Sequence, residues 1–140
     1  MPLPRIVKLA ETHVHLRLHA SSEFLTPDFS KTVPSGERTI IWDPEAAGLL
    51  GGVGQQSGSS GHDGERHLDG DELLYLISGA MQLSLELDDG STVALPLKPG
   101  EAILVPQGHW HRIIIDEPSS YLFLGGGRTE IRVRPGSRPG

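Results

Sequence analysis

The sequence predicts a single all-β domain that folds as a small barrel or sandwich. Three observations favour this class: short segments alternate between apolar and polar residues, turn residues separate them regularly, and no helical pattern lies between them. The 140 residues include 18 glycines and 11 prolines, a composition typical of many turns. We expect one domain over residues 1–134 and a flexible tail at 135–140.

The segment from His13 to His19 predicts the first strand. Its apolar residues, among them Val14 and Leu16, share one face, while His13 and His15 share the other. This alternation places the two histidines on a solvated face. A metal site at His13-x-His15 has little support, because no glutamate follows at the interval that such a site would need.

The next segments predict a strand, a short helical turn and a loop. Residues 39–42 (TIIW) have strand character and end at Asp43-Pro44. Residues 45–50 could form a helical turn. Residues 51–64 read GGVGQQSGSSGHDG, which indicates a mobile loop. It would lie beside the candidate metal site described below, either as a lid or as a disordered connection.

The second half of the chain predicts a run of strands joined by tight turns. The turns fall at residues 78–79, 88–90 and 98–100. The expected strands are residues 73–77, 81–87, 92–97, 102–105, 111–115, 121–124 and, at an edge of the sheet, 131–133.

The overall composition excludes several classes of function. The net charge of -6 argues against nucleic-acid binding, which relies on a basic surface. The absence of cysteine excludes disulfides and thiolate metal sites. No apolar stretch has the length of a signal peptide or a membrane span, so we expect a soluble, cytoplasmic protein without membrane partners.

Four residues of metal-ligand type form the candidate site. Glu65 and His67 are two residues apart on a predicted strand and therefore point to the same side. A tight turn can bring Glu72 back beside His67, and His111 begins a later strand. Two imidazoles and two carboxylates suit one divalent ion, Fe, Mn or Zn. With one carboxylate off the metal, a 2-His-1-carboxylate triad would remain.

Each candidate ligand also has a simpler interpretation. His67 and His111 could be hydrogen-bonded pocket residues, and Glu72 could be a turn carboxylate beside an arginine. Glu65 has three possible roles: a ligand, a catalytic base held beside the metal, or a sign that the metal site has been lost.

The segment from residue 65 to residue 79 resembles the first motif of the cupin family. That motif places a His-x-His pair, then four residues, a glutamate, six residues and a glycine. Glu65-x-His67, Glu72 and Gly79 match this spacing. Two positions depart from it: Glu65 replaces the usual first histidine, and Ser59 replaces the usual opening glycine. In an alternative register, Asp69 would be the second member of the pair.

The segment from residue 100 to residue 111, GEAILVPQGHWH, resembles the second cupin motif. Gly100, Pro106, Gly108 and His111 match its spacing fully, while Ile115 replaces an asparagine that is common there. The resemblance implies a double-stranded β-helix, or jelly-roll barrel, whose core motifs lie within residues 59–124.

The resemblance implies a range of functions. Cupins include dioxygenases, isomerases, decarboxylases, cyclases, storage proteins and sugar sensors. We expect a metal-binding cupin that acts on a small organic molecule inside the barrel, as an oxygenase, isomerase or cyclase, with Glu65 as the catalytic residue. The alternative is a non-catalytic cupin that binds or senses a small ligand. A homodimer that pairs strands near the N-terminus or at residues 131–133 is expected under either function.

Overall fold

The computed structural model describes residues 3–45 and 48–134, which form eleven strands and no helix. The predicted all-β class is therefore confirmed. The expected tail at 135–140 and part of the expected helical turn at 45–50 lie outside the described residues. Within the described part of the chain, no helix has the length and apolarity to cross a membrane.

The strands follow the chain in short and long segments. In chain order they are β1 (His13–Leu16), β2 (Glu23–Leu25), β3 (Thr32–Pro34), β4 (Thr39–Trp42), β5 (Leu49–Gln56), β6 (Glu65–His67), β7 (Glu72–Glu86), β8 (Thr92–Leu97), β9 (Ala102–Val105), β10 (His111–Gly125) and β11 (Thr129–Arg132).

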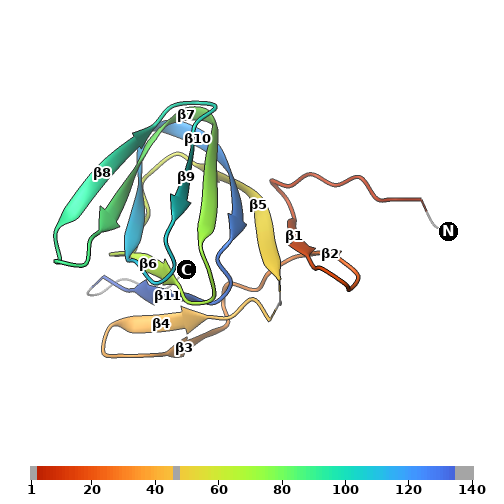
Figure 1. The fold of residues 1–140 in the computed structure, drawn as a ribbon, viewed down its shortest axis with the longest axis horizontal. Coiled ribbons are helices and arrows are strands. Elements are labelled where there is room, and N and C mark those ends of the chain that lie inside the picture. Colours follow the sequence, from red (N-terminus) through yellow and green to blue (C-terminus); the bar gives the residue numbers. More distant parts are fainter. Residues whose placement is uncertain (1–2, 46–47, 135–140) are drawn as a thin grey trace.

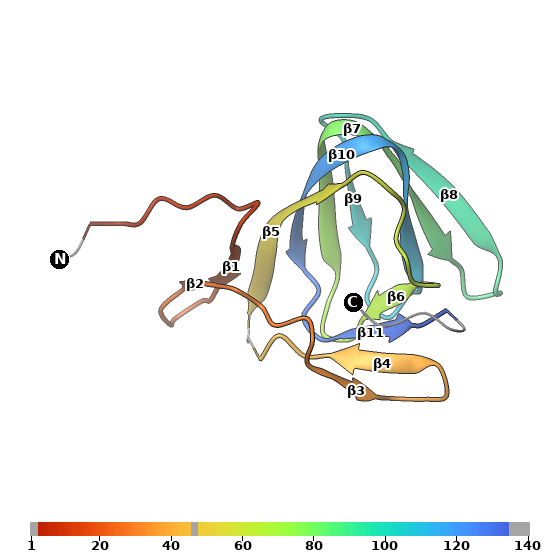
Figure 2. The ribbon, with the colours of Figure 1, turned by 180° about the vertical axis from the view of Figure 1, so that it is seen from behind.

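All strands belong to one curled antiparallel sheet (Figure 1). Its main path runs β2-β1-β5-β10-β6-β11-β4-β3, and β7 joins it by pairing with β10, β8 and β9. The view from behind shows β6 and β11 between the upper strands and the β3–β4 hairpin (Figure 2). The segment before β1 extends away from the curled sheet in both views.

The two long strands, β7 and β10, bend together. The turn predicted at Ser78-Gly79 is a bend inside β7, where Gly79 has a φ of 94°. An added Cβ at Gly79 would lie 2.3 Å from the carbonyl oxygen of Pro118 in β10. The bend shifts the buried face of β7 from even-numbered residues (Leu74 and Leu76) to odd-numbered ones, beginning at Met81.

The hydrophobic core lies among β7, β8, β9 and β10. In the first half of β7, Leu74 is 1% exposed and occupies the inward position, whereas Leu73 is half-buried. Glu72, the first residue of β7, is itself buried, and alternate residues follow it inward. The buried core residues are Leu74, Leu76, Met81, Leu83, Leu97, Val105 and Ile113.

The prediction of a loop over residues 51–64 is wrong for its first part. Residues 51–56 belong to β5, which pairs with both β1 and β10. Gly52 lies opposite Phe123 and Gly54 lies opposite Tyr121. A Cβ at Gly54 would lie 2.3 Å from Cζ of Tyr121, so these glycines leave room for aromatic rings.

The remaining loop, residues 57–64, is fastened to β10. The amide of Ile115 donates to Ser59 Oγ at 2.9 Å, and the amide of Ser60 donates to the carbonyl of Ile113 at 3.1 Å. Two of the three departures from the cupin motifs, Ser59 and Ile115, are therefore direct partners.

The predicted faces of β1 are reversed. His15 is 3% exposed, whereas Leu16 is 44% exposed. His13 is half-buried, and a Cβ at Gly52 would lie 2.6 Å from its Cδ2 atom. The absence of a side chain at Gly52 thus makes room for an imidazole, which an alternation pattern alone does not reveal.

The prediction of an edge strand at residues 131–133 is also wrong. The observed strand, β11, lies between β6 and β4 and pairs with both. It therefore has no unpaired edge for the expected pairing between subunits. The homodimer itself stays a prediction.

Candidate metal centre

Three strands bring the four predicted ligands together. Glu65 and His67 are at the two ends of β6, and His111, the first residue of β10, lies directly opposite Glu65. Glu72 begins β7. The bend before β10 is held against β6, because the amide of Gly108 donates to the carbonyl of His67 at 2.9 Å.

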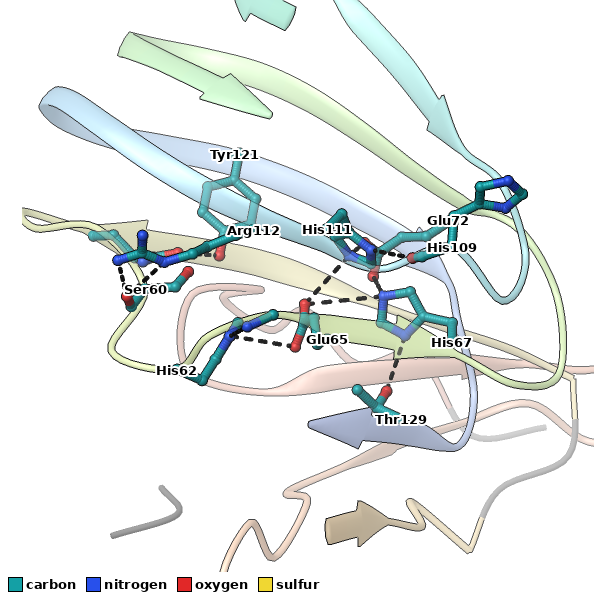
Figure 3. A network of polar contacts seen from close by, with 12 residues as sticks. Ser60, His62, Glu65, His67, Glu72, His109, His111, Arg112, Tyr121 and Thr129 are labelled. Atoms are coloured by element: carbon teal, nitrogen blue, oxygen red, sulfur yellow. Dashed lines mark hydrogen bonds and ion pairs between the residues drawn. The ribbon is translucent and has the colours of Figure 1, made fainter. Parts of the chain in front are cut away.

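The side chains of these residues converge (Figure 3). Oε1 of Glu65 lies 3.5 Å from Nε2 of His111 and 4.0 Å from Nε2 of His67. Glu72 approaches the same two nitrogens, at 3.1 Å from His67 and 3.9 Å from His111. Glu65, His67 and His111 each offer a ligand atom within 4.8 Å of the others, and Glu72 adjoins this group.

Hydrogen bonds on the far side of each ring determine which nitrogen faces the group. Nδ1 of His111 lies 3.0 Å from the carbonyl of His109, which can only accept. Nδ1 of His67 lies 2.9 Å from Oγ1 of Thr129, whose hydroxyl donates to the carbonyl of Gly127. Both Nδ1 atoms therefore carry the proton in the neutral rings, and both Nε2 atoms present a lone pair.

This arrangement fits a divalent metal ion. Among the described residues, the Nε2 atoms of His67 and His111 are buried and face carboxylate oxygens, which cannot donate a hydrogen bond to the nitrogen lone pairs. Buried polar atoms without a partner are costly, and coordination would satisfy both. Two neutral imidazoles and a carboxylate are ligands that Fe(II), Mn(II) and Zn(II) accept. The Glu-His-His group can thus hold a metal ion.

The local charges keep Glu65 ionised. Burial raises the pKa of its carboxyl, but the neighbouring imidazoles, His111 first and then His67 and His62, lower it to about 2. Burial lowers the pKa of His67, whereas the adjoining carboxylates of Glu72 and Glu65 raise it, and the net change is upward. An ionised carboxylate beside two imidazoles is the charge state that a metal site needs.

His62 lies beside the outer oxygen of Glu65. Nδ1 of His62 accepts the amide hydrogen of Gly64 at 3.0 Å, so the neutral ring carries its proton on Nε2. That nitrogen lies 3.7 Å from Oε2 of Glu65, which is longer than a hydrogen bond. The loop that precedes β6 therefore places an N–H group near the carboxylate.

The alternative register, with Asp69 as a ligand, is not what the structure shows. Oδ2 of Asp69 accepts the amide of Arg128 at 2.8 Å, and its Oδ1 pairs with the guanidinium. The neighbouring Asp71 accepts the amide of Gln107 at 2.8 Å. These carboxylates tie the turn before β7 to two other loops and leave Glu72 as the residue that reaches the histidines.

A cavity of about 390 Å³ adjoins the group and contains residues that the sequence analysis did not assign to the site. Thr129 follows three glycines with positive φ, Gly125 to Gly127, which turn the chain beneath His67. No sequence motif marks this threonine. His13 was expected in solvent, yet it lines the cavity. Tyr121 lines it too, with its hydroxyl donating to Oε1 of Gln56 at 2.6 Å.

Comparisons with known proteins support the fold. No protein-family model and no curated protein sequence matches this chain. Two structures of oxalate decarboxylase variants from Bacillus subtilis match with TM-scores of 0.51 and 0.53, at 19% and 15% identity. These matches cover 70% and 86% of this chain but only 28% and 29% of the decarboxylase chain.

A smaller protein is similar over most of its length. A cupin-2 domain protein from Shewanella frigidimarina aligns over 72% of this chain and 79% of its own, at 16% identity and a TM-score of 0.46. The fold assignment does not depend on this weaker match. The curled antiparallel sheet, the Glu-His-His group and the likeness to oxalate decarboxylase together give this chain the fold of a small cupin.

Proposed function

We propose that this chain is a metal-dependent cupin enzyme that acts on a small organic molecule in the cavity beside Glu65, His67 and His111. The convergence of two buried, unpartnered Nε2 atoms and an ionised carboxylate is the observation that carries this proposal. The Mn(II) centres named for a Bacillus subtilis oxalate decarboxylase structure are consistent with it.

In this proposal the three residues hold one Fe, Mn or Zn ion. Such an ion supplies Lewis-acid polarisation of a substrate oxygen. Glu72 adjoins both histidines and either becomes a fourth ligand or accepts hydrogen bonds from the substrate. The assignment of Glu65 as a catalytic base stays a prediction. A carboxyl with a pKa of about 2 is a weak proton acceptor at neutral pH, which favours the role of metal ligand for Glu65.

The cavity supplies the remaining requirements of an enzyme site. Its walls combine the polar group with Leu74, Ile113 and aromatic rings, so that a bound molecule would bury apolar surface beside the polar group. The phenol of Tyr121 stays protonated, because burial and the charges of Glu65 and Glu72 raise its pKa. Because this hydroxyl donates to Gln56, its oxygen can accept a hydrogen bond from a substrate without adding charge.

Elemental analysis of protein purified without added metal tests the proposal. We expect about one Fe, Mn or Zn per chain, and loss of that metal in His67→Ala and in His111→Ala. His109→Ala is the matched control, because its ring points away from the group while its backbone carbonyl still anchors His111 (Figure 3).

Four outcomes decide between the candidate functions. Metal that stays bound in both His→Ala variants would refute the site, as would a metal-free wild-type protein that fails to take up added Fe(II), Mn(II) or Zn(II). Bound metal with turnover of a small molecule supports the enzyme. Bound metal with ligand-induced stabilisation and no turnover across a substrate panel supports the sensing alternative.

A further inference from the structure

Aromatic rings line the cavity on the side of the N-terminal strands. His13 of β1 meets Phe123 of β10 edge to face, with ring centroids 5.0 Å apart. Phe29, in the connection between β2 and β3, lies 5.9 Å from His13 and stacks on Trp42 of β4 at 4.8 Å. All four residues line the same cavity as the Glu-His-His group. We call them the aromatic wall.

Phe29, Trp42 and Phe123 give the aromatic wall a carbon surface. The indole N–H of Trp42 donates to the carbonyl of Asp28 at 3.0 Å, so the side chain has no hydrogen-bond donor left for a ligand. Trp42 is 8% exposed and fixed by this bond, whereas Phe29 is 56% exposed beside it. A large apolar ring that lines a cavity and remains so exposed has contact area available for a ligand.

The charges around the cavity favour a neutral occupant. Among the residues that the structure describes, those lining the cavity include Glu65 and Glu72 but no lysine or arginine. A divalent ion would offset these two carboxylates and leave no net charge for an ionic ligand to pair with. Burial also lowers the pKa of His13, which keeps its ring neutral at physiological pH.

We infer that the cavity takes a neutral molecule carrying an aromatic ring, which packs against Phe29, Trp42 and Phe123 while a polar substituent faces the Glu-His-His group. This inference rests on the proposed function, since it takes the occupant of the cavity as the substrate. A volume of about 390 Å³ suits a single substituted ring. Offset or edge-to-face packing on the wall would favour a ring over a saturated molecule of the same size.

A series of matched probes tests the inference on the metal-loaded full chain. Benzyl alcohol and cyclohexylmethanol carry the same hydroxymethyl group and differ in the ring alone, while benzoate and benzylammonium carry opposite charges. Calorimetric titration measures each affinity. We expect benzyl alcohol to bind more tightly than the other three, by about 2- to 10-fold over cyclohexylmethanol.

A tryptophan reporter locates the bound probe. The chain has two tryptophans, and Trp110 packs beneath the guanidinium groups of Arg66 and Arg132 rather than in the cavity. In Trp110→Phe, the emission of Trp42 should change on addition of benzyl alcohol. Phe29→Leu should weaken binding about 2- to 10-fold, whereas Phe24→Leu, which alters a ring outside the cavity lining, should not.

The metal content of each sample separates this inference from the proposed function. Phe29-dependent binding of benzyl alcohol to a chain that takes up no added Fe(II), Mn(II) or Zn(II) would support the inference and refute the metal centre. Equal affinity for cyclohexylmethanol, tighter binding of benzoate or benzylammonium, or an affinity unchanged in Phe29→Leu would overturn the inference even with metal bound.

Discussion

Replacement of Thr129 by valine should weaken metal binding without touching a ligand. Its hydroxyl lies 2.9 Å from Nδ1 of His67 and, at 5% exposure, no water can readily replace it. Without this acceptor nothing favours the proton on Nδ1. The tautomer with the proton on Nε2 gains, because Glu72 lies 3.1 Å from that nitrogen, and it has no lone pair for the metal.

The expected loss is about 10- to 100-fold in metal affinity, the usual effect of removing an outer partner of a histidine ligand. This corresponds to about 1.4 to 2.7 kcal/mol. Competition with a chromophoric chelator at fixed pH measures the affinity directly. Thr129→Ser keeps the hydroxyl and should retain most of it.

Thr12→Val is the control for loss of a threonine hydroxyl as such. Oγ1 of Thr12 donates to the carbonyl of Leu25 at 3.0 Å, away from the site. We expect Thr12→Val and Thr129→Val each to lower the free energy of unfolding by about 1 kcal/mol. The metal affinity of Thr12→Val should be unchanged. The reasoning fails if Thr129→Val binds metal as tightly as Thr12→Val.

Two further predictions concern the scaffold. Gly54→Ala should lower the free energy of unfolding by about 1–3 kcal/mol, because the added Cβ would lie 2.3 Å from Tyr121. Gly58→Ala, which has open space around it, should leave the free energy of unfolding nearly unchanged. Denaturant titrations measure both values. Arg128 lowers the pKa of Asp69 below 3.8, so this carboxylate stabilises the fold above that pH and the contribution is lost as pH falls through the lowered value. In acid titrations followed by circular dichroism, Asp69→Asn should lose most stability at neutral pH, and the loss should shrink as the pH falls below 3.8; a loss that does not change with pH would contradict the assignment.

Much of the fold was predictable from local patterns. The strands expected at residues 39–42, 92–97 and 102–105 have the predicted bounds, because turn residues end each one and do not depend on the rest of the chain. The long strands β7 and β10 were each predicted as two shorter strands, because Gly79 interrupts the pattern of β7 and an irregular stretch interrupts that of β10. A bend and a turn have similar local signals, and only the neighbouring strand distinguishes them.

The candidate site was predictable in part for the same reason. Glu65 and His67 share a face because a strand repeats every two residues, and the spacing to Glu72 allows a tight turn. The role of Thr129 was not predictable, because it reaches His67 across 62 positions of the chain. The aromatic wall likewise joins residues from β1, β4, β10 and a connecting loop.

The sequence by itself determined the all-β class, the lack of thiolate ligands and the residues that could meet a metal. These features follow from composition and from spacings of a few residues, which local geometry converts into shared faces. Only the tertiary structure decided the tautomers of His67 and His111, the burial of His15 and the strand made by a glycine-rich segment. Each of these depends on what lies opposite in the sheet, and cross-strand neighbours are set by register rather than by local pattern.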